Sequence, residues 1–195
     1  WKPSRRRVCG TWESDLMVVE AEVDGSFFTF PDGWELEKLD EWREQQKVTQ
    51  PPFHSKGCDL VAMRDTTLWL IEAKDYTYPG AKVPDDLADK VGLKVFHSLA
   101  ILHAVARWGV GSRQEFSVRA LACQEARVCL AVELPDRGRR MIGVATPLAN
   151  LKNELKRVTR KLNVHRPVVS NSHMMNGVPW KIRRDPRTRD KHADR

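Results

Sequence analysis

Cysteine and long apolar stretches are scarce in this sequence, and both absences narrow the classes of protein to which it can belong. The four cysteines form no CxxC pair and have no histidine at zinc-finger spacing. A zinc finger and a disulfide-rich secreted scaffold are therefore excluded, and we expect reduced thiols in a cytoplasmic protein, with Cys58 and Cys129 as packing residues. No apolar run approaches the roughly 20 residues of a membrane span, and residues 1–7 lack a signal-peptide core. The sequence predicts a soluble protein with no membrane partner.

Internal repeats and low-complexity tracts are also missing, which argues against a repeat protein or a disordered chain. The 195 residues are 41% hydrophobic and 30% charged, a balance that allows a buried core without disulfides or a structural metal. Because one domain commonly takes roughly 100 to 200 residues, the sequence predicts a single domain over residues 1–164. Residues 165–195 are predicted to form a basic extension that is partly flexible.

The excess of positive charge lies at the C-terminal end of the chain. Residues 152–195 hold 13 of the 33 Lys and Arg residues but only 4 of the 26 Asp and Glu residues, which leaves the earlier part slightly acidic. Such an asymmetry is typical of a protein that binds a polyanion, and nucleic acid is the partner we expect. A solvated helix followed by a basic tail without any partner explains the charge equally well.

Strands are predicted in the first part of the chain. Residues 17–23 and 26–30 flank Asp24-Gly25, a pair that tolerates the positive φ angles of a tight hairpin turn, although the same segment also fits a helical stripe. Residues 34–40 fit either a strand or a short helix, and residues 47–57, with two consecutive prolines, are predicted to be a loop.

A buried hairpin is predicted at the centre, because residues 58–63 and 67–74 are short apolar runs separated by a turn. The elements expected after it are a helix over residues 85–108, strands over 116–123 and 127–134, and a helix over 148–162. This order predicts an α/β fold in which a mixed β-sheet is flanked by helices, with a basic helix and tail at the C-terminus.

Two carboxylates and one ammonium group are expected to converge where the central hairpin ends. Side chains alternate along a strand, so Glu72 and Lys74 project from the same face, and Asp59 begins the neighbouring antiparallel strand. Two carboxylates with room for water are a ligand set that suits Mg²⁺, and a lysine beside them can position water or stabilise developing negative charge. A weak surface ion pair is the competing interpretation, but the charges directly follow a buried apolar run, where they call for a partner.

The segment with Asp59 followed by Leu-Ile-Glu72-Ala-Lys74-Asp-Tyr resembles the PD-(D/E)XK nuclease superfamily, over roughly residues 34–108. The resemblance implies a restriction-endonuclease-like core of a helix, three antiparallel strands, a helix and a further strand. It implies that Asp59 and Glu72 bind Mg²⁺, which Mn²⁺ can replace, with the carbonyl of Ala73 as an extra ligand and Lys74 on the attacking water.

Further site residues remain open. Members of the superfamily often carry another acidic residue, for which the candidates are Glu20, Glu37, Asp40 and Glu41, with Asp40 preferred. Lys90 and Lys94 on the long helix are candidates to reach the site, as polar residues of the second helix do in similar nucleases, and snorkelling to solvent explains Lys94 equally well. His54 is a weak candidate for proton transfer, His97 and His103 are expected to be packing or surface residues, and Trp180 either stacks on a base or, as we prefer, packs the tail on the core.

The function predicted is that of a metal-dependent endonuclease acting on DNA rather than RNA, in a bacterial anti-phage defence or restriction-type system. Basic residues of the last helix are expected to follow the phosphate backbone, namely Lys152, Lys156, Arg160 and Lys161. The active unit is expected to be a homodimer or to join partner subunits. The alternative is a catalytically silent nucleic-acid-binding subunit of a larger complex.

Overall fold

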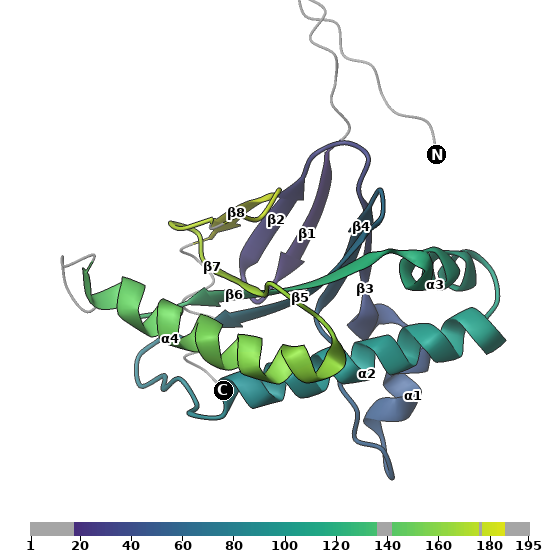
Figure 1. Ribbon diagram of the computed structural model, residues 1–195, viewed down its shortest axis with the longest axis horizontal. Coiled ribbons are helices and arrows are strands. Elements are labelled where there is room, and N and C mark those ends of the chain that lie inside the picture. Colours follow the sequence, from purple (N-terminus) through teal and green to yellow (C-terminus); the bar gives the residue numbers. More distant parts are fainter. Residues whose placement is uncertain (1–17, 136–141, 176, 186–195) are drawn as a thin grey trace, which may run out of the picture.

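The computed structural model describes residues 18–135, 142–175 and 177–185, which form a mixed α/β fold with two β-sheets and four α-helices (Figure 1). The predicted fold class is confirmed at this level. None of the described helices combines the length and apolar character needed to cross a membrane.

The larger sheet has five strands in the order β3-β4-β5-β6-β7. Its strands are β3 (Glu35–Lys38), β4 (Leu60–Arg64), β5 (Thr67–Asp75), β6 (Glu125–Glu133) and β7 (Val168–Ser170). β3, β4 and β5 are antiparallel neighbours, whereas β5, β6 and β7 run parallel. Parallel neighbours need a crossover, and helices supply it here. The predicted central hairpin and the strand over residues 127–134 are thereby confirmed.

The crossover helices lie on one face of this sheet (Figure 1). They are α2 (Leu87–Trp108) and α3 (Ser112–Ala122) between β5 and β6, and α4 (Ile142–Thr159), followed by a short 3-10 turn, Arg160–Leu162, before β7. α2 and α4 occupy the positions of the two predicted helices. Leu148, Leu151 and Leu155 are buried against this face, as the apolar seam of the last helix requires.

The opposite face is covered by a second, antiparallel sheet in the order β1-β2-β8. Its strands are β1 (Val19–Val23), β2 (Ser26–Phe30) and β8 (Lys181–Arg184). Asp24 and Gly25 both have positive φ angles, 47° and 73°, so the predicted hairpin is confirmed and the helical alternative is wrong. The helix that the superfamily resemblance places before the three antiparallel strands is not found in residues 18–34, which form β1 and β2 instead.

Residues 34–57 join the sheets to the helices. They form β3, a 3-10 turn (Leu39–Glu41) and the short helix α1 (Arg43–Thr49), followed by an irregular segment. Part of the predicted loop is therefore helical. Leu39 and Trp42 are fully buried and attach this region to the helix-covered face.

The predicted strand over residues 116–123 is wrong, because these residues belong to α3. The segment alternates apolar and polar residues at its start, which is typical of a strand. Burial instead follows a four-residue step, with Phe116 and Ala120 inside and Val118 half exposed. A helix buries only one side of such a segment, and that is the pattern found.

The part of the C-terminal extension that the structure describes belongs to both sheets. β7 closes one edge of the larger sheet and β8 pairs with β2, so the predicted boundary at residue 164 does not coincide with an edge of the fold. The predicted flexibility is wrong for residues 181–184, and the remainder of the basic tail, from residue 186, lies outside the described residues. Trp180 is only 2% exposed and packs against Trp69, with ring centroids 4.9 Å apart, so our preferred interpretation of Trp180 is confirmed.

Candidate active site

The three residues predicted to form the site meet where the central hairpin ends. The register of β4 and β5 pairs Leu60 with Ile71, so Asp59 lies one step beyond, next to Glu72. The backbone N–H of Ala73 donates a hydrogen bond to Asp59 Oδ2 at 2.8 Å, which holds the carboxylate at this position. Lys74 Nζ lies 2.7 Å from Glu72 Oε1.

Alternation along β5 decides which layer the site faces. Leu68 and Leu70 pack in the core under the helices, whereas Trp69 and Ile71 pack against the second sheet. Continuing this pattern, Glu72 and Lys74 lie on the helix-covered face and Ala73 on the other. The predicted placement of the acidic and basic side chains on one face therefore holds.

A second lysine enters the site from α2. Lys94 Nζ lies 2.5 Å from Glu72 Oε1 and 3.5 Å from Asp59 Oδ1, so it bridges the two carboxylates. Of the two lysines expected on this helix, Lys94 is thus the one that reaches the site. Lys90 instead pairs with Asp86 on the surface, at 2.9 Å.

Glu72 is the most buried charge of the group, with a side chain 0% exposed, whereas Lys74 is 29% exposed. Burial, and then the neighbouring charge of Asp59, raise the pKa of Glu72 above its ordinary value, while the two lysines act in the opposite direction. For Lys74, burial lowers the pKa, but the charges of Glu72 and Asp59 outweigh it and the net shift is upward. Lys74 therefore keeps its proton at neutral pH.

The segment that carries Asp59 is fixed by contacts that sequence reasoning did not find. Gln45, buried in α1, accepts a hydrogen bond from the N–H of Gly57 at 3.1 Å, and Ser98 Oγ of α2 accepts one from the N–H of Cys58 at 2.7 Å. A Cβ at Gly57 would lie 2.9 Å from Leu39 Cδ1, so this position leaves no room for a side chain. The sequence offers no pattern that links residues so far apart.

Cys58 is a packing residue, as predicted, even though it neighbours Asp59. It is 1% exposed, and burial, followed by the charge of Glu72, raises its pKa far above the ordinary value. Its thiol therefore stays protonated and is a poor nucleophile. Cys129 is also buried as predicted, with a pKa raised by burial to about 12, and Cys58, Cys123 and Cys129 are all free. Cys9 lies outside the described residues.

The donor set fits a small hard cation held by two carboxylates. Among the described residues, no group of three or more His, Cys, Asp and Glu side chains converges on one point. Mg²⁺ needs fewer, since it usually binds one or two carboxylates and keeps several waters. Glu72 Oε2 is buried without a hydrogen-bond partner and is therefore free to bind a metal ion. Glu72 Oε1 already contacts both lysines. The expected role of the Ala73 carbonyl remains a prediction.

The four candidates for a further acidic residue are placed differently. Glu20 accepts a hydrogen bond from Thr29 in the second sheet, Glu37 accepts one from Trp42 Nε1 at 3.0 Å, and Glu41 lies 3.5 Å from Lys38. Asp40 lines a hollow that also contains Asp59 and Lys94. Asp40 is therefore the candidate that shares this hollow with Asp59.

This polar hollow has a volume of about 640 Å³ and lies beside the carboxylates, between α1, α2 and the segment that leads into β4. Its lining consists mainly of polar side chains and backbone: Asp40, Gln45, Gln46, Thr49, Gln50, Lys56, Gly57, Cys58, Asp59 and Lys94. The site therefore opens into a space with hydrogen-bonding walls.

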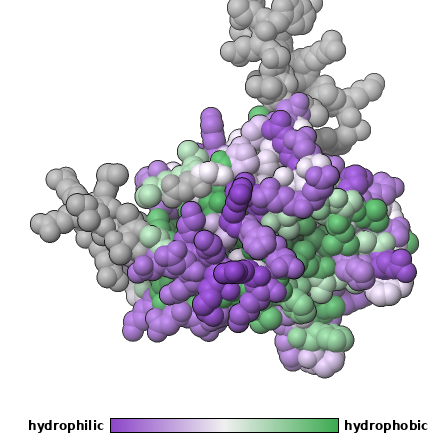
Figure 2. Space-filling view, in the orientation of Figure 1, coloured by the Kyte–Doolittle hydropathy of each residue, from purple (hydrophilic) through white to green (hydrophobic). Residues whose placement is uncertain are grey.

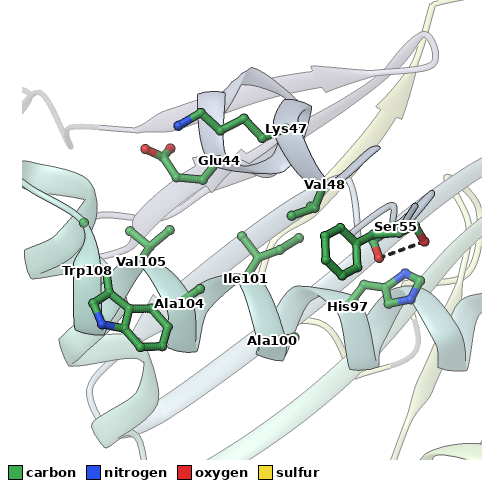
Figure 3. A pocket seen from close by; sticks show the side chains of 12 residues that line it. Glu44, Lys47, Val48, Ser55, His97, Ala100, Ile101, Ala104, Val105 and Trp108 are labelled. Carbon is green, nitrogen blue, oxygen red and sulfur yellow. Dashed lines mark hydrogen bonds between the residues drawn. The ribbon is translucent and has the colours of Figure 1, made fainter. Parts of the chain in front are cut away.

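A second hollow, of about 420 Å³, lies between α1 and α2 and is mostly apolar (Figure 3). Ile101 and Val105 line it from α2 and Val48 lines it from α1, while Trp108 lies at one end and His97 at the other (Figure 3). Neither carboxylate of the candidate site takes part in it.

The histidines lie outside the carboxylate cluster. His97 Nδ1 lies 3.2 Å from the backbone N of Lys56, and the His103 ring contacts Trp108, so both are packing or surface residues as expected. His54 is exposed, and among the described residues its side chain has no hydrogen-bond or ion-pair partner. No observation supports a role for it in proton transfer.

The four basic residues predicted to contact nucleic acid are exposed. Lys152 and Lys156 lie on α4, and Arg160 and Lys161 lie in the turn that follows it. Figure 2 shows hydrophilic surface over the region of α4. α4 packs directly on α2, the helix that carries Lys94.

Comparisons with known proteins give a distant similarity to a tRNA ligase. No protein-family model matches the chain, and no solved structure matches it. The chain is similar to the cysteine–tRNA ligase of Neisseria meningitidis serogroup A, with 29% identity over 198 residues. The match covers 80% of this chain but only 28% of the ligase.

Proposed function

We propose that this chain is a Mg²⁺-dependent nuclease that hydrolyses phosphodiester bonds of DNA, with a restriction-endonuclease-like fold. The observation that carries the proposal is the convergence of Asp59, Glu72 and Lys74 on one face, at the end of a buried hairpin. Three antiparallel strands followed by a helix and a parallel strand also agree with the order that the superfamily resemblance implies.

Asp59 and Glu72 are the residues that would hold the metal ion, because both are carboxylates and Glu72 Oε2 has no protein partner. When bound, Mg²⁺ would supply positive charge for a phosphate oxygen and lower the pKa of water. Mn²⁺ would serve the same purpose.

The chain's own groups position the reactants. The Ala73 N–H fixes the Asp59 carboxylate, and Lys74 retains its proton, so Nζ donates a hydrogen bond to water or to a phosphate oxygen that enters the site. Lys94 offers a second ammonium, which contacts the same Glu72 oxygen as Lys74 does. Two fixed cations beside the reacting phosphate stabilise charge that develops during in-line attack.

The basic surface after the core helices would hold the substrate. Lys152, Lys156, Arg160 and Lys161 would contact phosphates, which adds affinity without reading sequence. Residues 18–135, 142–175 and 177–185 include no separate specificity module, so we assign target recognition to partner subunits or a second copy, in an anti-phage defence or restriction-type system. That assignment is by analogy with similar small nucleases.

The test is cleavage of plasmid, linear duplex and single-stranded DNA, with and without Mg²⁺ or Mn²⁺. The ligase similarity makes tRNA the necessary fourth substrate. We expect metal-dependent cleavage of DNA that falls at least about 100-fold in Glu72→Gln and in Lys74→Ala, because each removes charge from the reacting centre. Glu22→Gln and Lys82→Ala, at exposed positions that belong neither to the ion pairs of the site nor to the lining of the polar hollow, should cleave normally.

The proposal is wrong if neither site variant loses cleavage, or if no substrate is cut with either metal. Cleavage of tRNA alone would support phosphodiester hydrolysis at this site, but it would show that the substrate is RNA and not DNA.

One observation favours a second candidate, a silent nucleic-acid-binding subunit. Lys74 and Lys94 together balance the charges of Asp59 and Glu72, so the four ionised groups sum to zero without a metal ion. This candidate requires DNA binding that persists in EDTA and no cleavage under any condition tested above.

A further inference from the structure

The polar hollow beside the carboxylates provides a confined space next to the reacting centre. At about 640 Å³ it falls within the range of small-ligand sites, roughly 300 to 1,000 Å³. Asp59 and Lys94 form part of its lining, so whatever occupies it lies against the proposed reacting centre. This size suits one nucleotide of a strand rather than a duplex.

The wall of the hollow is held rigidly. Gln45 donates a hydrogen bond to the carbonyl of Ser55 and accepts one from Gly57, and Thr49 Oγ1 bonds to the carbonyls of Gln45 and Ser55. The N–H of Cys58 is tied to Ser98 of α2. A ligand that enters this space therefore meets a preformed wall and loses little free energy in ordering it.

Three side chains of the rim still have unused hydrogen-bonding capacity. Within the described part of the chain, the Asp40 carboxylate, the Gln50 amide and the Lys56 ammonium have no hydrogen-bond or ion-pair partner. Together they offer an acceptor, a mixed donor and acceptor, and a cation. This combination matches a nucleotide, which has N–H donors and carbonyl or ring-nitrogen acceptors on its base and an anionic phosphate.

We infer that the polar hollow binds one unpaired nucleotide next to the scissile phosphate, so that single strands, ends or gaps are preferred over intact duplex. Asp40 accepts a hydrogen bond from the base, Gln50 bonds to the same edge, and Lys56 contacts the flanking phosphate. In a duplex this base edge is already paired, and the base must leave the stack at a cost of a few kcal/mol. The inference rests on the proposed function and gives it a substrate class.

Binding in EDTA tests the subsite without catalysis. The probes are a fluorescent 12-nucleotide single strand and its duplex, measured by anisotropy against wild type, Asp40→Ala, Gln50→Ala and Lys56→Ala. Wild type should bind the single strand more tightly, and Asp40→Ala and Lys56→Ala should each weaken that binding about tenfold while leaving duplex binding unchanged. Glu22→Ala and Lys82→Ala are the matched controls, and circular dichroism checks folding.

Equal loss for both probes, no loss in the rim variants, or no binding of either probe by wild type would overturn the inference. Cleavage separates it from the proposed function. If Mg²⁺-dependent cleavage occurs but single strand and duplex are cut equally by wild type and Asp40→Ala, the subsite is wrong and the nuclease stands. If nothing is cut but the rim variants selectively lose single-strand binding, the subsite stands and the nuclease is wrong.

Discussion

At Glu72, the stability of the fold and the proposed metal site have conflicting requirements. Its side chain is fully buried, and one of its carboxylate oxygens has no hydrogen-bond partner. Removing a charge from water costs several kcal/mol, which ion pairs repay only in part. Two lysines converge on its other oxygen, so the chain partly compensates this cost while leaving one oxygen free.

We expect the cost of burying Glu72 to appear as a pH dependence of stability when wild type is compared with Glu72→Gln. Because burial raises the folded-state pKa above the ordinary value of 4.5, the folded state binds the proton more tightly than the unfolded state. The free energy of unfolding of wild type, relative to Glu72→Gln, should therefore fall as pH rises from about 4.5 and level off above the folded-state pKa. Urea denaturation of both proteins between about pH 4 and pH 8 measures this difference.

The matched control is Glu22→Gln, whose carboxylate is exposed on β1. It shows what the same exchange of Glu for Gln does at the surface of the protein. A Glu72 difference that is flat, or that grows with pH, would show that burial does not dominate the titration.

At the scale of elements, the packing of α2 on α4 depends on one glycine. A Cβ added at Gly92 would overlap the Cγ1 atom of Val158, so the two helices are in direct contact here. Alanine is otherwise favoured over glycine inside a helix by about 1 kcal/mol. The steric cost and the gain in helix propensity therefore have opposite signs.

We expect steric overlap to prevail, with Gly92→Ala lowering the free energy of unfolding by about 1 to 3 kcal/mol. Urea denaturation measures the loss. The double variant Gly92→Ala with Val158→Ala removes the overlapping methyl groups and should recover part of it, which a purely local effect at residue 92 would not do.

At the scale of the whole molecule, one ion pair connects the second sheet to the strand that carries the site. Arg184 of β8 donates to Asp75 Oδ2 at 2.6 Å, and the Asp75 side chain is only 9% exposed. Asp75 follows Lys74 directly, so the C-terminal strand is attached next to the candidate site.

Arg184→Met should lower the free energy of unfolding by about 2 to 3 kcal/mol, because it leaves a mostly buried carboxylate without its cation. Arg183→Met, which removes a neighbouring exposed arginine that stacks on Phe27, should cost less than about 1 kcal/mol. Chemical denaturation of the two variants measures the losses. Equal losses would mean that the burial of Asp75 does not strengthen its ion pair with Arg184.

The sequence was informative where local patterns decide the structure. The alternation of residues 67–74 predicted both the buried strand and the shared face of Glu72 and Lys74, and the apolar steps of residues 148–162 predicted a helix seam. Asp59 was found for the same reason, since a hairpin brings the start of one strand to the end of the next.

It was less informative where distant segments decide. Residues 116–123 alternate like a strand, but their packing against α2 favours a helix. The charged residues 181–184 looked like a flexible tail, yet pairing with β2 makes them a strand. Gln45 and Ser98 support Asp59 from 14 and 39 residues away, and such support follows only from the folded chain.

The two faces of β5 meet different neighbours: Glu72 points to lysines, and Ala73 to a layer of aromatic rings. The two-residue turn between Arg64 and Thr67 fixes the pairing of β4 with β5. A slip of one residue in this pairing would turn every side chain of one strand into the wrong layer. The turn therefore determines which layer receives the charges of Glu72 and Lys74.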